Sequence, residues 1–139
     1  MATKLIKDFP GLVTISWNED LDAIYLKWHT EHDEGGRVIE AVKFALSYVN
    51  DHNIKHWWVD LSTSAHGLKE TDQAWVQTEF GKAISESSLT KLAMTPPLPD
   101  TGQNIDWLDD WESSTNAKYR GKIEARLVQN EDEVRTHFK

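Results

Sequence analysis

The chain contains no cysteine, and this absence excludes disulfide bonds, thiol nucleophiles and cysteine-ligated metal sites. Basic residues are also scarce, because 15 lysines and arginines stand against 23 aspartates and glutamates and leave a formal net charge of −8. No local run of Lys or Arg compensates for this imbalance. The composition therefore disfavours binding to nucleic acid or to an anionic membrane surface, since both need clustered positive charge.

Long apolar runs are missing as well. No segment approaches the roughly 20 apolar residues of a membrane span, and Met1–Val13 has no apolar core of signal-peptide length. We therefore expect no membrane span and a cytoplasmic protein. The chain length of 139 residues predicts a single domain over 1–139, and seven tryptophans provide large rings for its core.

Alternation of apolar and polar residues predicts the strands. Leu12–Trp17 and Ala23–His29 both alternate with period two, and the Asp/Asn-rich stretch NEDLD between them predicts the turn of a β-hairpin. Ile54–Ser62 is an almost continuous apolar strand, which is typical of a strand covered on both faces. Two further strands are predicted at Leu89–Thr95 and Lys122–Val128.

Helical spacing of apolar residues predicts four helices, at 37–52, 68–84, 105–114 and 130–138. Thr71 is the expected N-cap of the second helix, and Asn130, followed by acidic residues, that of the last one. The predicted order is β-β-α-β-α-β-(α)-β-α. Strands that alternate with helices imply crossover connections, so we expect an α/β protein with a mixed, mostly parallel β-sheet and flanking helices.

The hairpin, the first helix and the motif IKH running into VDL, within Ile54–Leu61, resemble the SpoIIAA-like fold. That group contains the STAS domains of anti-sigma-factor antagonists and the STAS/SEC14-like bacterial proteins, most of which are uncharacterised. The resemblance extends over Leu12–Phe138 and rests mainly on the order of the elements. It implies a single SpoIIAA-like (STAS/SEC14-like) domain with a regulatory or binding role.

The chain departs from the STAS regulators where their phosphorylated serine lies. In those regulators an Asp-Ser-Ser-Gly box opens the helix that follows the central strand. Here the corresponding segment, His66–Glu70, reads HGLKE, and the nearby hydroxyl residues come earlier in the chain. The resemblance therefore does not carry over control by phosphorylation at this place.

The loop after the central predicted strand is the first candidate binding site. It carries Asp60, Ser62, Thr63, Ser64 and His66. Ligands of open α/β sheets bind outside the carboxyl ends of the strands, where hydroxyls and free backbone N–H groups can hold an anion. The same residues are also common turn and capping residues, so a purely structural role is the alternative.

The tryptophans provide a second candidate. Trp57 and Trp58 are neighbours on one strand and must point to opposite faces of the sheet. Together with Trp75 from the following predicted helix, Trp58 is expected to line a cavity between sheet and helix. The alternative is ordinary core packing, because large rings commonly fill small cores.

The predicted helix at 105–114 provides a third candidate, a lid over that site or an interface with a partner. Its apolar edge contains Trp107, Leu108 and Trp111, while acidic residues occupy the rest of its surface. Docking of this edge on the same chain is the alternative, since apolar helix faces are usually buried within their own domain.

Metal and catalytic motifs give little support to an enzyme. His29–Glu34 holds imidazoles and carboxylates, but it lacks a third histidine at motif spacing and the HExxH pattern, so we predict an exposed polar loop and no metal site. The chain has no nucleophile elbow, P-loop or dinucleotide fingerprint, and we predict neither a cofactor nor catalytic residues. A hydrolase-like pairing of His66 with Asp60 or Glu70 stays open as an alternative.

The sequence thus favours a non-catalytic cytoplasmic module that binds a partner protein or a small ligand. A SEC14-like carrier of a small apolar ligand is the main alternative, and a dry cavity larger than about 300 Å³ would favour it. A small hydrolase-like enzyme and a homodimer with a structural role are the other two. The residues alone do not decide among these hypotheses.

Overall fold

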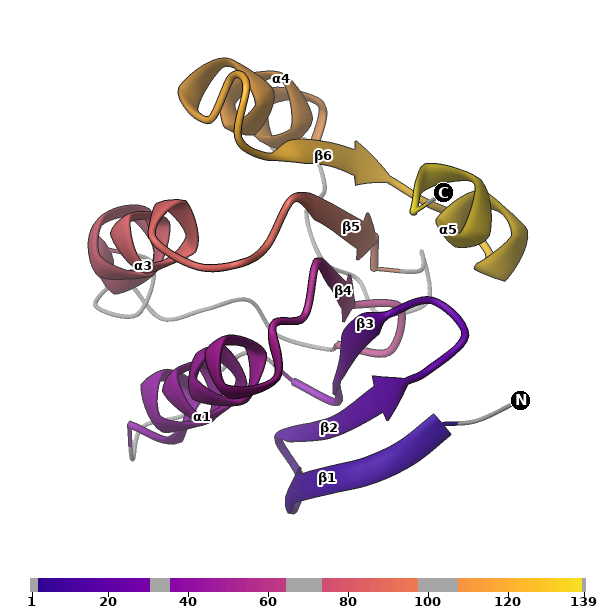
Figure 1. Cartoon of the computed structure of the whole chain (residues 1–139). Helices are drawn as coiled ribbons and strands as arrows, with labels where there is room; N and C mark the ends of the chain where they lie inside the picture. Colours follow the sequence, from indigo (N-terminus) through magenta and orange to yellow (C-terminus); the bar gives the residue numbers. More distant parts are fainter. Residues whose placement is uncertain (1–2, 31–35, 65–73, 98–107, 139) are drawn as a thin grey trace.

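The computed structural model describes residues 3–30, 36–64, 74–97 and 108–138. Six strands form one sheet in the order β1-β2-β3-β4-β5-β6, so strands adjacent in the sequence lie side by side (Figure 1). The strands are β1 (Thr3–Phe9), β2 (Val13–Asn18), β3 (Ala23–Trp28), β4 (His56–Asp60), β5 (Lys91–Thr95) and β6 (Glu124–Leu127). The described helices are α1 (Arg37–His52), the π-helical turn η1 (Val76–Phe80), α3 (Gly81–Ser85), α4 (Leu108–Lys118) and α5 (Glu131–His137).

The sheet is mixed. β1, β2 and β3 pair in antiparallel fashion, whereas β3, β4, β5 and β6 run parallel to one another. Parallel strands that follow one another across a sheet are joined by crossovers of the same hand, and this places α1, α3 and α4 on one face (Figure 1). Helix α5 lies on the opposite face (Figure 1). The predicted α/β class with a mixed, mostly parallel sheet is therefore confirmed.

Several predicted elements are found close to their expected positions. The predicted hairpin corresponds to β2 and β3, which pair Ile15 with Leu26. The first helix is α1, and the double-tryptophan strand is β4, which lies inside the sheet between β3 and β5. The helix expected at 105–114 corresponds to α4, which extends as far as Lys118. The expected N-cap Thr71 lies outside the described residues.

The predicted order of elements began with a strand at Leu12 and is wrong at this end, because the structure has an earlier strand, β1. Strand β1 pairs with β2 from Thr3↔Asn18 to Phe9↔Val13, but its register shifts between Leu5 and Lys7. An irregularity of this kind places an extra residue in one strand and interrupts the alternation that identifies strands in a sequence.

The main core lies between the sheet and α1, α3 and α4. Three of its side chains, Ile15, Ile24 and Leu26, are completely buried on the sheet side. Helix α1 covers them with one apolar stripe: Val38, Ala41, Val42, Ala45, Leu46 and Val49. Full burial of one such large side chain contributes about 1.5–3 kcal/mol. None of the described helices is both long enough and apolar enough to cross a membrane.

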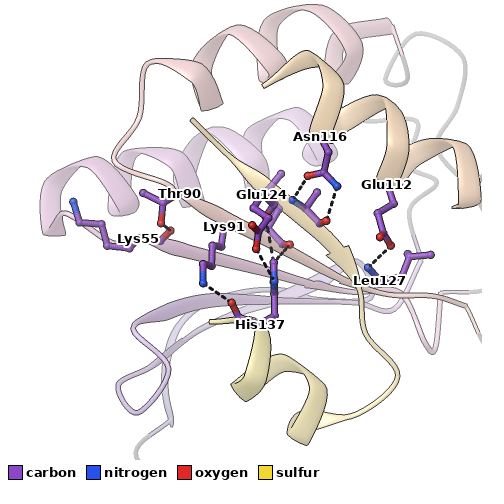
Figure 2. A network of polar contacts seen from close by, with 10 residues as sticks. Lys55, Thr90, Lys91, Glu112, Asn116, Glu124, Leu127 and His137 are labelled. Atoms are coloured by element: carbon purple, nitrogen blue, oxygen red, sulfur yellow. Dashed lines mark hydrogen bonds and ion pairs between the residues drawn. The ribbon is translucent and has the colours of Figure 1, made fainter. Parts of the chain in front are cut away.

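The outer edge of β6 is capped by side chains of α4 (Figure 2). The amide of Asn116 accepts a hydrogen bond from the backbone N–H of Ala125 at 2.6 Å and donates to its carbonyl at 3.0 Å. The carboxylate of Glu112 accepts from the N–H of Leu127 at 3.0 Å. These side chains occupy backbone groups with which another strand would otherwise pair, so this edge is protected from intermolecular pairing.

Helix α5 closes the other face of the sheet. The side chain of Asn130 accepts from the backbone N–H of Glu133 at 3.0 Å, which confirms the predicted cap. At the end of the helix, Phe138 stacks on His56 of β4 with ring centroids 4.5 Å apart. A second, smaller apolar cluster forms beneath it, with partly buried Trp58 at its margin: Leu21, Ala23, Ala93, Val128, Val134 and Phe138.

His137 anchors α5 to two strands (Figure 2). Its Nε2 lies 2.9 Å from the carbonyl oxygen of Leu92 and 3.2 Å from that of Glu124, so this nitrogen must carry a hydrogen and donate it. The Glu124 carboxylate lies 3.6 Å from Nδ1, and the Lys91 ammonium donates to the backbone carbonyl of His137 at 2.7 Å. Burial lowers the pKa of His137, and its contacts with these carbonyls and with Glu124 oppose the shift only in part.

We expect the stability of the protein to fall as the pH drops below the ordinary histidine pKa of 6.5. A histidine whose pKa is lowered by folding binds protons more readily in the unfolded chain, so its contribution is complete above 6.5 and is lost on acidification. Urea unfolding of wild type and of His137→Gln, above and below this pH, measures the contribution. A stability difference between the two proteins that does not change with pH would contradict the assignment.

Candidate functional site

A cavity of about 450 Å³ lies between the sheet and α1, α3 and α4 and is partly open to solvent. The sheet contributes its floor and the three helices its walls. The described residues that line it are mostly apolar: Trp28, Val38, Val42, Trp57, Val59, Leu61, Phe80, Gly81, Ile84, Leu92, Ala93, Met94, Trp111, Ser114, Thr115, Lys118 and Tyr119. The volume lies within the range of roughly 300–1,000 Å³ that is usual for small-molecule sites.

The strand pattern explains why the floor is apolar. Successive side chains of a strand point to opposite faces, so Trp57, Val59 and Leu61 all point toward the helices. Trp28 and Met94 join them from the ends of β3 and β5. The cavity therefore extends to the carboxyl ends of the parallel strands, where open α/β sheets generally bind ligands.

Helix α4 contributes a different kind of wall. Helix α4 lines the cavity with Trp111, Ser114, Thr115 and Lys118, and Tyr119, directly after the helix, also belongs to the lining. Their spacing of three and four residues marks one face of a helix, and a face that covers a sheet is normally apolar. Four of these five residues carry a hydroxyl or an ammonium group, and the fifth is Trp111. The sequence prediction missed this stripe because the expected helix ended at Ser114.

Two polar groups, from Lys118 at the end of α4 and from Tyr119 directly after it, lie beside Gly81 of α3. A Cβ atom at Gly81 would lie 2.6 Å from the Tyr119 hydroxyl oxygen and 3.0 Å from Lys118 Nζ. The Lys118 ammonium also lies 5.4 Å from the centre of the Tyr119 ring. Glycine at this buried position leaves the room that the two polar groups occupy. This part of the cavity thus combines an ammonium group with a phenol hydroxyl.

A second polar cluster lies on the opposite face of the sheet, outside the cavity. The Tyr25 hydroxyl donates a hydrogen bond to the buried Asp60 carboxylate, and the Tyr25 ring lies 4.4 Å from that of Trp58. The indole N–H of Trp58 donates to the Thr95 hydroxyl at 2.9 Å. Burial, the hydrogen bond to Asp60 and the charge of that carboxylate together raise the pKa of Tyr25 well above its usual range.

The residues after β4 form hydrogen bonds within the protein through two backbone N–H groups and the Thr63 hydroxyl. The backbone N–H of Ser62 donates to the Asp60 carboxylate at 2.9 Å, and the Thr63 hydroxyl donates to the carbonyl of Trp28 at 3.3 Å. Ser64 is completely buried, and its backbone N–H donates to the carbonyl of Leu61 at 3.0 Å. These contacts are the ones that a turn after a strand uses to satisfy its own backbone.

The structure divides the predicted site residues between the two faces of the sheet. The prediction that Trp58 lines the cavity is corrected, because its neighbour Trp57 does so and alternation points Trp58 the other way. Partly buried Trp75 stacks on the cavity residue Phe80, with ring centroids 6.4 Å apart. Trp111 lines the cavity as part of α4.

Three predicted positions cannot be placed. His66 and Trp107 lie outside the described residues, and so does the side chain of Leu108, although this residue begins α4. The same holds for Glu70, the second possible carboxylate partner of His66. The hydrolase-like pairing is therefore untested.

Within the described ranges, no group of three or more histidine, aspartate or glutamate side chains could hold a metal ion. His29 is the described histidine of the polar segment that follows β3, and its Nε2 lies 3.1 Å from the Thr14 hydroxyl.

No protein-family model, curated protein or solved structure matches this chain. The functional interpretation therefore rests on the geometry and chemistry of the residues described above.

Proposed function

We propose that the protein is a non-catalytic binding module that holds one small, mainly apolar ligand in the cavity between the sheet and α1, α3 and α4. The observation that carries the proposal is the mainly apolar cavity of about 450 Å³, partly open to solvent, between the sheet and the three helices. A concave and mainly apolar space of this volume is typical of small-molecule binding sites.

The surroundings of the cavity support binding rather than catalysis. Its floor and α1 wall offer aromatic and aliphatic side chains, which bind apolar groups without reacting with them. The Asp60 carboxylate is the acidic group of the predicted site. It lies on the opposite face of the sheet and accepts hydrogen bonds from the Tyr25 hydroxyl and the backbone N–H of Ser62. It is thus not directed at the cavity.

We also propose that the chain has a SpoIIAA-like fold. The hairpin β2–β3, helix α1 and the central strand β4 support this proposal. Within that group the carrier hypothesis accounts for the cavity, whereas regulation by phosphorylation has no serine box to act on at His66–Glu70. A protein partner, a homodimer and a cytoplasmic location stay predictions from the sequence.

Identical valine-to-phenylalanine substitutions at two positions of α1 test the proposal. Val42 lines the cavity, whereas Val49 is completely buried and is not part of the lining. Val42→Phe should fill empty space and leave stability nearly unchanged, whereas Val49→Phe should destabilise by about 1–3 kcal/mol through overpacking. Octanol should raise the melting temperature of wild type and Val49→Phe but not that of Val42→Phe.

Two results would overturn this function. If Val42→Phe destabilises as strongly as Val49→Phe, the space beside Val42 is already filled. If octanol stabilises Val42→Phe as much as wild type, the alcohol binds somewhere else. Isothermal titration calorimetry with the same three proteins gives the stoichiometry, and the expected value is one ligand per chain.

A further inference from the structure

We infer that the ligand carries an uncharged carbonyl group, whose oxygen accepts a hydrogen bond from the indole N–H of Trp28 or Trp57 on the floor of the cavity. This inference rests on the proposed function, since it specifies the ligand of the same cavity. The observation behind it is a pair of buried donor groups that have no acceptor within the described part of the chain.

The two indoles are buried at the cavity without a hydrogen-bond partner. Trp28 and Trp57 both line the cavity, and each residue is only 4% exposed. Among the described residues, neither indole N–H has an acceptor, whereas that of Trp58 on the opposite face donates to the Thr95 hydroxyl. A buried indole N–H usually finds an acceptor, because otherwise it loses its hydrogen bond to water without replacement. The floor thus presents two donors that the protein itself does not satisfy.

The composition of the floor explains this lack of acceptors. Apart from the two indoles, the floor consists of aliphatic side chains and the thioether of Met94, which is at most a weak acceptor. The hydroxyl groups of the lining lie on the wall formed by α4 and the residue after it. An indole N–H can only donate, so a ligand that matches the floor must bring an acceptor. Small-molecule sites commonly combine an apolar lining with a few such groups, which fix the orientation of the ligand.

The apolar floor favours an acceptor without charge. An ionised group placed there would lose most of its hydration for a single N–H donor, which is strongly unfavourable. A carbonyl oxygen loses less on leaving water, and one N–H group satisfies it. A ketone or an ester with an apolar body therefore fits both the lining and the donors.

Water is the competing partner of the two donors. The cavity is partly open to solvent, but a buried water molecule typically makes about three hydrogen bonds. The floor side chains offer such a molecule one N–H group and otherwise apolar surface, so a water molecule is weakly held there. A ligand carbonyl replaces this water at little cost, because it keeps the hydrogen bond to the indole.

The strand register places the two donors at opposite ends of the floor. Trp57 of β4 is level with Ile24 of β3, and Trp28 lies four residues beyond Ile24 on that strand. At about 3.3 Å per residue the two positions are roughly 13 Å apart, so a single ligand oxygen reaches only one indole. Substitution of each tryptophan in turn identifies the donor.

Two probes of the same shape test the inference. Acetophenone has a carbonyl oxygen where α-methylstyrene has a methylene group, so only acetophenone can accept a strong hydrogen bond. Calorimetry measures the binding of both to wild type, Trp28→Phe and Trp57→Phe, because these variants lose an indole N–H but keep an aromatic ring. Trp58→Phe is the matched control, since it makes the same replacement on the opposite face of the sheet.

At the donating position, the phenylalanine variant should weaken acetophenone binding about tenfold and α-methylstyrene binding less than about threefold. The ratio of the two effects cancels the loss of ring volume, which both probes experience alike. Trp58→Phe should change neither affinity. Equal effects on the two probes in both Trp28→Phe and Trp57→Phe would overturn the carbonyl acceptor but leave the apolar site intact.

A spectroscopic measurement on wild type needs no substitution. A hydrogen bond to a carbonyl oxygen moves the NMR signal of the carbonyl carbon downfield, so isotope-labelled acetophenone should show this shift when bound, relative to its signal in cyclohexane. A bound signal at the cyclohexane position would overturn the inference even if the variants do not fold. Binding of octanol without binding of either probe would overturn it as well, whereas failure of all three compounds to bind would overturn the proposed function itself.

Discussion

Replacement of Trp57 by alanine should lower the free energy of unfolding by about 3–5 kcal/mol, whereas the same replacement of the adjacent Trp58 should lower it by about 1–2 kcal/mol. The two residues share chemistry, strand and position in the sequence, and they differ in the face of the sheet to which they point. Trp57 is buried at 4% exposure and packs against Phe80, with ring centroids 5.5 Å apart. Removal of its ring leaves a large void next to the cavity.

Trp58 occupies the less covered face. Its ring is half-buried beside Tyr25, and its indole N–H bonds to the Thr95 hydroxyl. Alanine at this position loses part of the apolar burial and one hydrogen bond, but water can reach the groups left behind. The expected loss is therefore smaller than that at Trp57.

Urea unfolding of the two alanine variants measures the difference in free energy of unfolding. Trp57→Phe and Trp58→Phe are two less disruptive variants for the same comparison. The phenylalanine variants keep a ring and should retain the same ranking if an alanine variant is too unstable to analyse. Equal losses at the two positions, or a larger loss at Trp58, would show that the helices do not cover the face of Trp57.

The strands and helices with a regular pattern could be predicted from the sequence, and the irregular ones could not. Ile15 and Leu26 belong to strands of clean alternation, and they pair as members of the predicted hairpin. The register shift between Leu5 and Lys7 interrupts the alternation of apolar and polar residues in β1, so this strand is identified only by its pairing with β2. A sequence records local periodicity but not the partner that stabilises an irregular strand.

The candidate site shows the same limit. Alternation requires that Trp57 and Trp58 point to opposite faces, but it does not say which face the helices cover. That choice depends on the crossovers from β3 to β6, which place α1, α3 and α4 on the side of Trp57. The stripe from Trp111 to Tyr119 has helical spacing and was detectable in principle, but its polar residues give no apolar signal with which to extend the helix.

Asp60 and Tyr25 should form a strongly coupled pair on the face opposite the cavity, and Asp60→Ala should destabilise the protein by about 2–4 kcal/mol. The carboxylate is buried at 7% exposure and accepts hydrogen bonds from the Tyr25 hydroxyl and from the backbone N–H of Ser62. Alanine removes both bonds. Tyr25→Phe removes one of them and leaves the buried carboxylate with one partner fewer, and we expect a loss of about 1.5–3 kcal/mol.

A double-mutant cycle on this pair separates their interaction from their individual roles, because residues in contact are not additive. The double variant should be more stable than the sum of the two single losses predicts, by about 1 kcal/mol or more. Because the folded pKa of Tyr25 is raised above its usual 10.0, wild type should also lose stability as the pH rises through and beyond that value, and Asp60→Ala should lose less. Additive single losses, together with identical alkaline behaviour of wild type and Asp60→Ala, would mean that Tyr25 and Asp60 act independently.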